Sequence, residues 1–336
     1  MKIADLLCAQ TSATRSARAR SLRVELSRSG IAGFAALAAC VQAAPPALPC
    51  KASPASESAE LSAPAGSMAT APRKLEIQNS ELLELSSAET HRDYELIVGL
   101  PRSYAEEPER RYPVIYVLDG QWDFNLINTL QGGLLYDKVV PEFLVVGIAY
   151  GGTKPDYEKL RGEDYTPTHS HPPFAKEPFG GDGAKFLSFL EQHVLPTIEQ
   201  RYRVDSSQRI LSGSSLGGLF SLYALFEKPE LFQNIIALSP AVGWDERYLF
   251  KREQAFHTAH PSLKTRVWLS VGSDEWPDYV KTDREFFAQF QHSNYEGLSA
   301  SVNVIEGERH AGVKPEAYNR AIRFVFEPWA ATQKRD

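Results

Sequence analysis

The chain has 336 residues, of which 43% are hydrophobic and 23% are charged. This composition is typical of a soluble globular protein with a large core, and it excludes disorder throughout. The 36 Lys and Arg residues against 42 Asp and Glu residues give a net charge of -6, so no nucleic-acid partner is expected. No run reaches the roughly 18 apolar residues that span a bilayer, so any membrane link must depend on the N-terminus.

Residues 1–44 have the order of a secretory signal peptide, because several arginines precede the apolar run 31–39. Cys40 follows Leu-Ala-Ala, as in a bacterial lipoprotein processing box, where the cysteine becomes the lipidated first residue. Ordinary cleavage after Ala44 and an overlong translation start are the alternatives. Residues 45–72 are rich in Ala, Ser and Pro and predict a flexible linker. We therefore expect an exported protein, periplasmic or anchored through a lipid on Cys40, with one catalytic domain at 73–336.

Short apolar runs then alternate with stretches of helical periodicity. Paired strands are expected at 82–85 and 94–100, followed by a buried strand at 113–118 and a helix at 124–135. The order predicts an α/β fold with a mostly parallel central sheet and helices on both faces. The remaining expected elements are the strand 142–150, the helix 186–202, the strand 209–212, the helix 219–227 and the strands 234–238, 266–271 and 299–305.

Residues 151–181 do not fit this alternation. They contain few apolar side chains and many Pro, His and charged ones, so we expect a long loop there rather than part of the scaffold. Long loops in compact domains tend to carry function.

The strongest local signal for chemistry is Gly213-Ser-Ser-Leu-Gly217, between the strand 209–212 and the helix 219–227. Glycines on either side of a serine permit the sharp turn that lifts its hydroxyl out of the sheet edge, because a side chain there would collide with neighbouring backbone. Ser215 is therefore the candidate nucleophile. The alternative is a structural turn without chemistry.

A serine hydroxyl is a poor nucleophile at neutral pH and needs a histidine base, with an acid before that histidine along the chain. Four histidines follow Ser215, and of these only His310 lies in a loop directly after an expected strand. The acid is expected just past the strand 266–271, where Asp274 and Glu275 are adjacent. Neighbouring side chains in a loop point in different directions, so one of the two should reach His310, and the residues alone leave both as candidates.

Several segments together resemble a known family. They are Tyr112-Pro-Val-Ile-Tyr-Val-Leu-Asp-Gly120, Pro196-Thr-Ile-Glu-Gln-Arg-Tyr202, 213–218, Ser239-Pro240, Val271-Gly-Ser-Asp-Glu275, the His310 loop, and Arg161 with Asp164-Tyr-Thr-Pro167. They resemble the α/β-hydrolase esterases related to esterase D, and in particular their enterochelin or siderophore-esterase-like branch. This family also includes S-formylglutathione hydrolase, acetylxylan and feruloyl esterases, and mycolyltransferases. The resemblance extends from Leu75 to about Trp329.

This resemblance implies an α/β-hydrolase fold and a role for five residues. The acid of the corresponding loop is a glutamate in the siderophore-esterase-like branch, which favours Glu275 over Asp274 beside Ser215 and His310. The resemblance also places an oxyanion hole at the backbone N–H groups of Leu216 and Gln121, where they would stabilise the negative oxygen of the acyl-transfer intermediate.

Three further residues are candidates for substrate binding. Trp122 and Trp244 are candidate pocket walls, although tryptophan is as often an ordinary core residue. Arg161 is a candidate for gripping a polar or anionic substrate group, with a surface salt bridge as the alternative.

These observations predict a serine carboxylic-ester hydrolase that acts through an acyl-enzyme on a small-molecule or glycan ester, of siderophore type or linked to polysaccharide. One alternative is an acyltransferase with the same triad, in which an alcohol replaces water. Another is an inactive, surface-anchored binding module that keeps the hydrolase scaffold. No cofactor and no metal site are expected, and the sequence does not fix the oligomeric state.

Overall fold

The computed structural model describes residues 76–171 and 177–333. The signal peptide 1–44, the linker 45–72 and Cys40 lie outside these ranges, so the structure leaves those predictions untested. Within the described ranges, no helix has the length and apolar content needed to cross a membrane.

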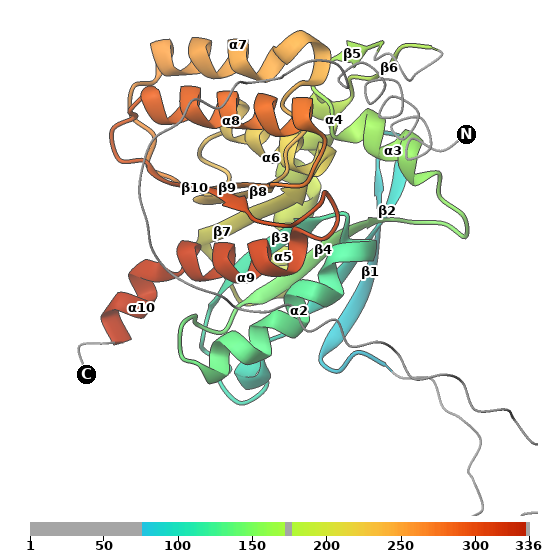
Figure 1. Cartoon of the computed structure of the whole chain (residues 1–336). Helices are drawn as coiled ribbons and strands as arrows, with labels where there is room; N and C mark the ends of the chain where they lie inside the picture. Colours follow the sequence, from blue (N-terminus) through green and yellow to red (C-terminus); the bar gives the residue numbers. More distant parts are fainter. Residues whose placement is uncertain (1–75, 172–176, 334–336) are drawn as a thin grey trace, which may run out of the picture. The chain divides into compact units, whose positions relative to one another are not determined.

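An eight-stranded sheet in the order β1-β2-β4-β3-β7-β8-β9-β10 forms the centre of the fold (Figure 1). Strand β2 pairs antiparallel with both of its neighbours, whereas the pairs from β4 to β10 are all parallel. The mostly parallel sheet predicted from the sequence is therefore confirmed. The strands are β1 (Ser80–Ser87), β2 (Arg92–Gly99), β3 (Tyr112–Leu118), β4 (Leu144–Tyr150), β7 (Val204–Ser214), β8 (Asn234–Leu238), β9 (Arg266–Gly272) and β10 (Ser299–Ile305).

Helices cover both faces of this sheet, as predicted. Alternate residues of a strand point to opposite faces, so Leu211 and Leu269 pack in one core cluster and Ile210 and Trp268 in the other. In Figure 1, α7 and α8 lie above the sheet, and α2 and α9 lie below it. The face that carries Leu211 and Leu269 is covered by α4 (Gly183–Phe189), α5 (Leu195–Arg201), α6 (Leu216–Glu227), α7 (Trp244–Ala259) and α8 (Pro277–His292). The opposite face, with Ile210 and Trp268, is covered by α2 (Gly120–Tyr136) and α9 (Lys314–Val325).

Two sequence predictions need correction in detail. The helix expected at 186–202 is α4 and α5 joined by a π-helical turn, Leu190–Val194. The stretch 151–181, expected as a loop, contains helix α3 (Tyr157–Asp164) and the two-residue strands β5 (His169–Ser170) and β6 (Phe179–Gly180). Helix α3 shows little apolar periodicity, and long-range ion pairs fix it to the scaffold instead. Such pairs leave no local pattern in a sequence, so the helix was not expected.

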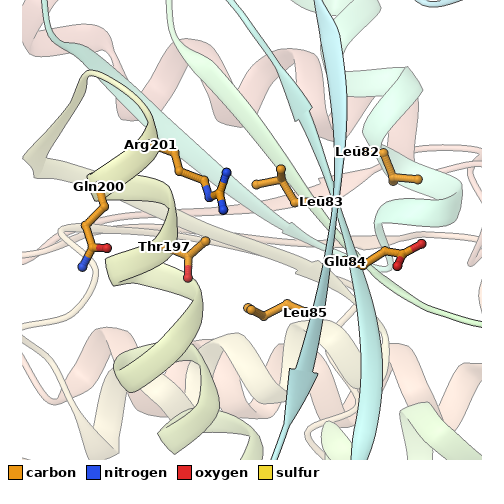
Figure 2. Close-up of a pocket in the computed structure, with 7 residues that line it drawn as sticks. All are labelled: Leu82, Leu83, Glu84, Leu85, Thr197, Gln200 and Arg201. Carbon is orange, nitrogen blue, oxygen red and sulfur yellow. The ribbon is translucent and has the colours of Figure 1, made fainter.

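Strand β1 forms one edge of the sheet, and a groove runs between it and α5 (Figure 2). Leu83 and Leu85 point from the strand toward the helix, whereas Leu82 and Glu84 point away from it. Three strands separate β1 from β7, so this groove lies apart from Ser215. The helix contributes Thr197, Gln200 and Arg201 to the lining.

Candidate active site

Ser215 lies at the sharp turn between β7 and α6, at the carboxyl edge of the parallel strands. Its φ of 60° and ψ of -119° lie in a region that residues with a side chain rarely adopt. The turn is held by two backbone hydrogen bonds, from the Ser215 N–H to the Leu238 carbonyl at 2.9 Å and from the Ala241 N–H to the Ser215 carbonyl at 3.0 Å. The strained backbone therefore presents the Ser215 side chain above the sheet edge, where it is half-buried.

Close backbone contacts explain two of the glycines around this turn, Gly213 and Gly218. A Cβ on Gly213 would lie 2.3 Å from the Gly217 carbonyl, which is closer than real Cβ contacts allow. A Cβ on Gly218 would lie 3.0 Å from the Pro240 Cα. The collision with backbone expected from the sequence is thus present at Gly213 but not at Gly217, where the nearest atom to an added Cβ is the side-chain Cβ of Leu118 at 3.5 Å.

His310 and Glu275 are joined by a short contact. His310 follows β10 and Glu275 follows β9, and Nδ1 of His310 lies 2.5 Å from Oε2 of Glu275. The other carboxylate oxygen, Oε1, accepts hydrogen bonds from the Ser239 hydroxyl at 2.5 Å and the Gly272 N–H at 2.8 Å. Glu275 has a fully buried side chain, so these partners fix both its oxygens and its orientation toward His310.

Asp274 takes a different direction from its neighbour. Its side chain is exposed, and Oδ1 accepts a hydrogen bond from the Ser273 hydroxyl at 3.0 Å. Of the two adjacent carboxylates, the structure therefore brings Glu275 and not Asp274 to His310.

Two aromatic residues that sequence reasoning missed flank the histidine. The rings of Trp276 and Tyr279 each lie 5.2 Å from the His310 ring, and Tyr279 meets it edge-on at 85°. The Tyr279 hydroxyl donates to the Ser239 carbonyl at 2.6 Å. Tyr279 thus links the backbone of Ser239 to the His310 side of the site. The motif around Glu275 gave the only sequence signal near these two residues.

The two predicted oxyanion-hole residues begin helices at the same edge of the sheet. Leu216 is the first residue of α6, and Gln121 is the second residue of α2. Among the described residues, neither backbone N–H has a hydrogen-bond partner, as expected in the first turn of a helix. The amide atoms of the Gln121 side chain are also buried without a partner in the described part of the chain.

Arg161 is occupied by an internal partner. Its Nε and Nη2 atoms donate to the two carboxylate oxygens of Asp119, at 2.7 Å and 2.9 Å. Asp119 is buried and adopts a left-handed φ of 58° directly before α2. The guanidinium also lies 5.3 Å from the centre of the Trp122 ring, and Trp122 is 49% exposed. Arg161 therefore supports the turn that carries Gln121, and its Nη1 atom has no hydrogen-bond partner among the described residues.

Trp244 lies in the hydrophobic core, with 9% of its surface exposed. Its indole N–H donates to the carbonyl and hydroxyl oxygens of Thr168, both at 3.2 Å, and its ring meets Phe179 edge-on. These contacts fix the segment around β5 and β6 to α7. The structure thus favours the core alternative for Trp244, and leaves Trp122 as the exposed tryptophan of the pair.

Arg92 on β2 fixes α3 through three carboxylates. It donates to Glu163 at 2.5 Å, to Asp164 at 2.6 Å and to Asp182 at 3.0 Å. Asp164 is fully buried and also accepts from the Tyr94 hydroxyl at 2.7 Å. Burial raises the pKa of Asp164 to about 7, although Arg92 and Tyr94 offset part of the rise. This network holds the helix from which Arg161 reaches Asp119.

A strand-to-helix serine turn on a mostly parallel sheet, with a histidine and a buried acid on later loops, defines the α/β-hydrolase class. Comparison with known proteins places the chain within this class. A family model described as "Putative esterase" matches residues 87–311, and the chain belongs to this family. It is an esterase of the siderophore-esterase-like branch.

Two curated relatives and one solved structure illustrate the similarity. The chain is 28% identical to ferri-bacillibactin esterase BesA of Bacillus subtilis, over 75% of the chain and 91% of that protein. It is 27% identical to the siderophore triacetylfusarinine C esterase of Aspergillus fumigatus, over 78% of the chain and 98% of that protein. The crystal structure of the BES protein from Bacillus cereus matches with a TM-score of 0.70 and 28% identity, over 77% of the chain and 99% of that structure. These relatives favour an enzyme over the inactive binding module.

Proposed function

We propose that Ser215, His310 and Glu275 form the catalytic triad of a serine carboxylic-ester hydrolase. The contact of 2.5 Å between His310 and the fully buried Glu275 is the observation that carries this proposal, because it orients the imidazole and stabilises its charged form. His310 accepts the Ser215 proton as Oγ attacks the ester carbonyl, and the imidazolium then protonates the leaving alcohol. Water hydrolyses the resulting acyl-enzyme with His310 again as the base.

The free N–H groups of Leu216 and Gln121 support the second part of this mechanism. The tetrahedral intermediate carries a negative oxygen, which preorganised backbone donors stabilise without reorganisation cost. Both groups begin helices, so their helix dipoles add positive potential at the same place. The ion pair between Asp119 and Arg161 keeps the Gln121 turn in position.

We propose siderophore-type esters as the substrate class. The support is the relatives named as esterases of ferri-bacillibactin and triacetylfusarinine C, which the chain matches over most of their length. The exposed Trp122 ring and Nη1 of Arg161, which has no partner in the part of the chain that the structure describes, would offer a flat apolar surface and a hydrogen-bond donor to an aromatic or acidic group of such a substrate. Polysaccharide-linked esters are the second candidate.

A hydrolysis panel tests this choice. The purified chain is assayed in parallel on a catecholate trilactone siderophore with and without iron, acetylated xylan, a feruloyl ester and short and long acyl esters. The proposal predicts the highest kcat/KM for the trilactone, and a drop in kcat/KM for it, but not for an acetyl ester, in Trp122→Ala. A preference for acetylated xylan or feruloyl esters would contradict the siderophore assignment and leave the esterase assignment intact.

We further propose that the protein is exported and that its signal is cut ahead of Cys40, which becomes the lipidated first residue of the mature chain. The basic residues before the short apolar run and the Leu-Ala-Ala-Cys order support this proposal. Mass spectrometry of the mature protein from its host provides the test. Lipid on an N-terminal Cys40 is the expected result, whereas an N-terminus at Pro45 would contradict the anchor and an intact leader would contradict export.

A further inference from the structure

Trp276 is an exposed indole beside the candidate base. It is 37% exposed, and its ring lies 5.2 Å from the His310 ring at an angle of 51°. The indole also meets the ring of Tyr279 at 5.9 Å and 66°. Trp276 directly follows Glu275 and precedes the first residue of α8, so its backbone belongs to the loop that carries the acid. The indole is therefore packed against two rings of the site and is still open to solvent.

The position of the exposed tryptophans relative to the site calls for an explanation. Among the described residues, Trp122 and Trp276 are the two tryptophans with exposed side chains. Trp122 directly follows Gln121, and Trp276 directly follows Glu275. Apolar side chains scattered singly over a surface are normal, but exposed aromatic rings beside convergent polar groups are typical of a binding site. The sequence analysis assigned a role to Trp122, whereas Trp276 has none.

The proposed mechanism places the alcohol part of an ester next to His310. Nδ1 of the imidazole is bonded to Glu275 at 2.5 Å, so Nε2 is the nitrogen that carries the proton to the leaving oxygen. A general acid must come within about 3 Å of the atom that it protonates. A ring attached one carbon beyond that oxygen then comes within reach of the Trp276 indole, which packs against the same imidazole.

The acyl part of the ester is placed by different groups. Its carbonyl oxygen turns toward the backbone N–H groups of Leu216 and Gln121, and its carbonyl carbon is bonded to Oγ of Ser215 in the acyl-enzyme. The alcohol part leaves with the proton from His310. The two sides of the scissile bond therefore meet different surfaces of the protein.

We propose that Trp276 binds an aromatic group on the alcohol side of the ester and gives the enzyme a preference for esters of arylmethyl alcohols. Two aromatic rings in offset or edge-to-face contact stabilise each other beyond the area that they bury. This inference rests on the proposed function, because it takes His310 as the acid that protonates the leaving alcohol. It deepens that function by naming the side of the substrate that the indole recognises.

Benzyl acetate and methyl phenylacetate provide the test, because they are isomers that differ in which side of the ester carries the phenyl ring. Values of kcat/KM for both are measured in the wild-type protein and in Trp276→Ala. The ratio of kcat/KM for benzyl acetate to that for methyl phenylacetate should fall about tenfold in the variant, since the aromatic contact is lost on the alcohol side. Trp276→Phe keeps a ring and should restore most of the ratio.

The ratio separates binding from a positioning effect on His310. A variant that only misplaces the imidazole lowers kcat/KM for both isomers by the same factor and leaves the ratio unchanged. Benzyl methyl ether adds a readout that does not depend on turnover, because it has the arylmethyl oxygen but no hydroxyl to accept an acyl group. Its inhibition constant against methyl phenylacetate should rise about tenfold in Trp276→Ala.

Tyr136→Ala is the matched control. Tyr136 is an aromatic side chain that is 88% exposed, at the opposite end of α2 from Gln121. Its ratio and inhibition constant should equal those of the wild-type protein. An unchanged ratio in Trp276→Ala, with unchanged inhibition by the ether, would overturn the inference and leave the proposed function intact. Wild-type rates on both isomers in Ser215→Ala would instead contradict the proposed function.

Discussion

Arg161 binds Asp119 through two parallel hydrogen bonds, from Nε at 2.7 Å and from Nη2 at 2.9 Å, across 42 residues of sequence. This ion pair joins α3, which lies in the unusual stretch 151–181, to the turn that begins α2. Burial raises the pKa of Asp119, and Arg161 offsets part of that rise. The guanidinium is therefore the group that allows a carboxylate to remain buried beside the predicted oxyanion hole.

Removing Arg161 alone should be costly. Arg161→Met leaves the buried Asp119 without its partner, so the free energy of unfolding should fall by roughly 3–5 kcal/mol, as for other buried pairs. The double variant Arg161→Met with Asp119→Asn should recover most of this loss, because no uncompensated charge remains. Urea denaturation of the two single variants and the double variant measures the coupling. Additive losses in the double variant would contradict the paired role.

The acid is assigned by comparing two adjacent carboxylates. Glu275→Gln should lower kcat by several orders of magnitude, because only a carboxylate stabilises the imidazolium of His310. Asp274→Asn should leave kcat within about twofold, since the Asp274 side chain is exposed and its carboxylate is bonded only to the Ser273 hydroxyl among the described residues. Steady-state kinetics on one ester substrate gives both values. The reverse ranking would transfer the role to Asp274, and small effects in both variants would indicate a Ser-His dyad.

Asp164 should make stability depend on pH in an unusual direction. Because burial raises its pKa to about 7, the folded state holds this proton more tightly than the unfolded state. Its contribution to stability is thus complete below about pH 4 and is lost as the pH rises to about 7. Asp164→Asn cannot ionise, so Tm should change less with pH across this window than in the wild-type protein. The same change of Tm with pH in Asp164→Asn as in the wild-type protein would contradict the raised pKa of Asp164.

Asp182 provides the matched control on the same Arg92. Partial burial raises the pKa of Asp182, but Lys185 and Arg92 outweigh this effect and hold the pKa below its ordinary value. Its stabilising contribution is therefore present above about pH 4 and is lost at lower pH, the opposite sign to Asp164. Asp182→Asn should therefore change the dependence of Tm on pH only in the acidic range, below about pH 4.

The close backbone contact at Gly213 in the Ser215 turn gives a prediction about substitution there. Gly213→Ala places a Cβ against the Gly217 carbonyl, so the turn must shift and Ser215 moves with it. Activity should fall by about 100-fold, as for other small displacements of a reacting group, with a loss of stability of more than about 1 kcal/mol. Gly132→Ala is the control, because a Cβ there meets no atom within 4 Å and lies in the exposed middle of α2. It should gain up to about 1 kcal/mol without loss of activity.

The sequence predicted those features whose cause is local. Strand β10 was expected at its observed bounds, and the serine turn was expected from its glycines, of which Gly213 has a steric reason within five residues of sequence, the backbone of Gly217. Helix α3 was not predicted, since Arg92 and Asp119, which stabilise it, lie far away along the chain. Tyr279 was missed for the same reason. A hydroxyl near an active site has no sequence pattern until the fold brings three loops together.

The central claim is that Ser215 is the nucleophile of an acyl-enzyme, and covalent labelling tests it most directly. The wild-type protein and Ser215→Ala are incubated with a fluorophosphonate, and peptide mass spectrometry locates the adduct. The account predicts one adduct on Ser215 in the wild-type protein, none in the folded variant, and a loss of kcat on the order of 10⁴ to 10⁶. An adduct on another residue, or more than a tenth of wild-type activity in Ser215→Ala, would contradict it.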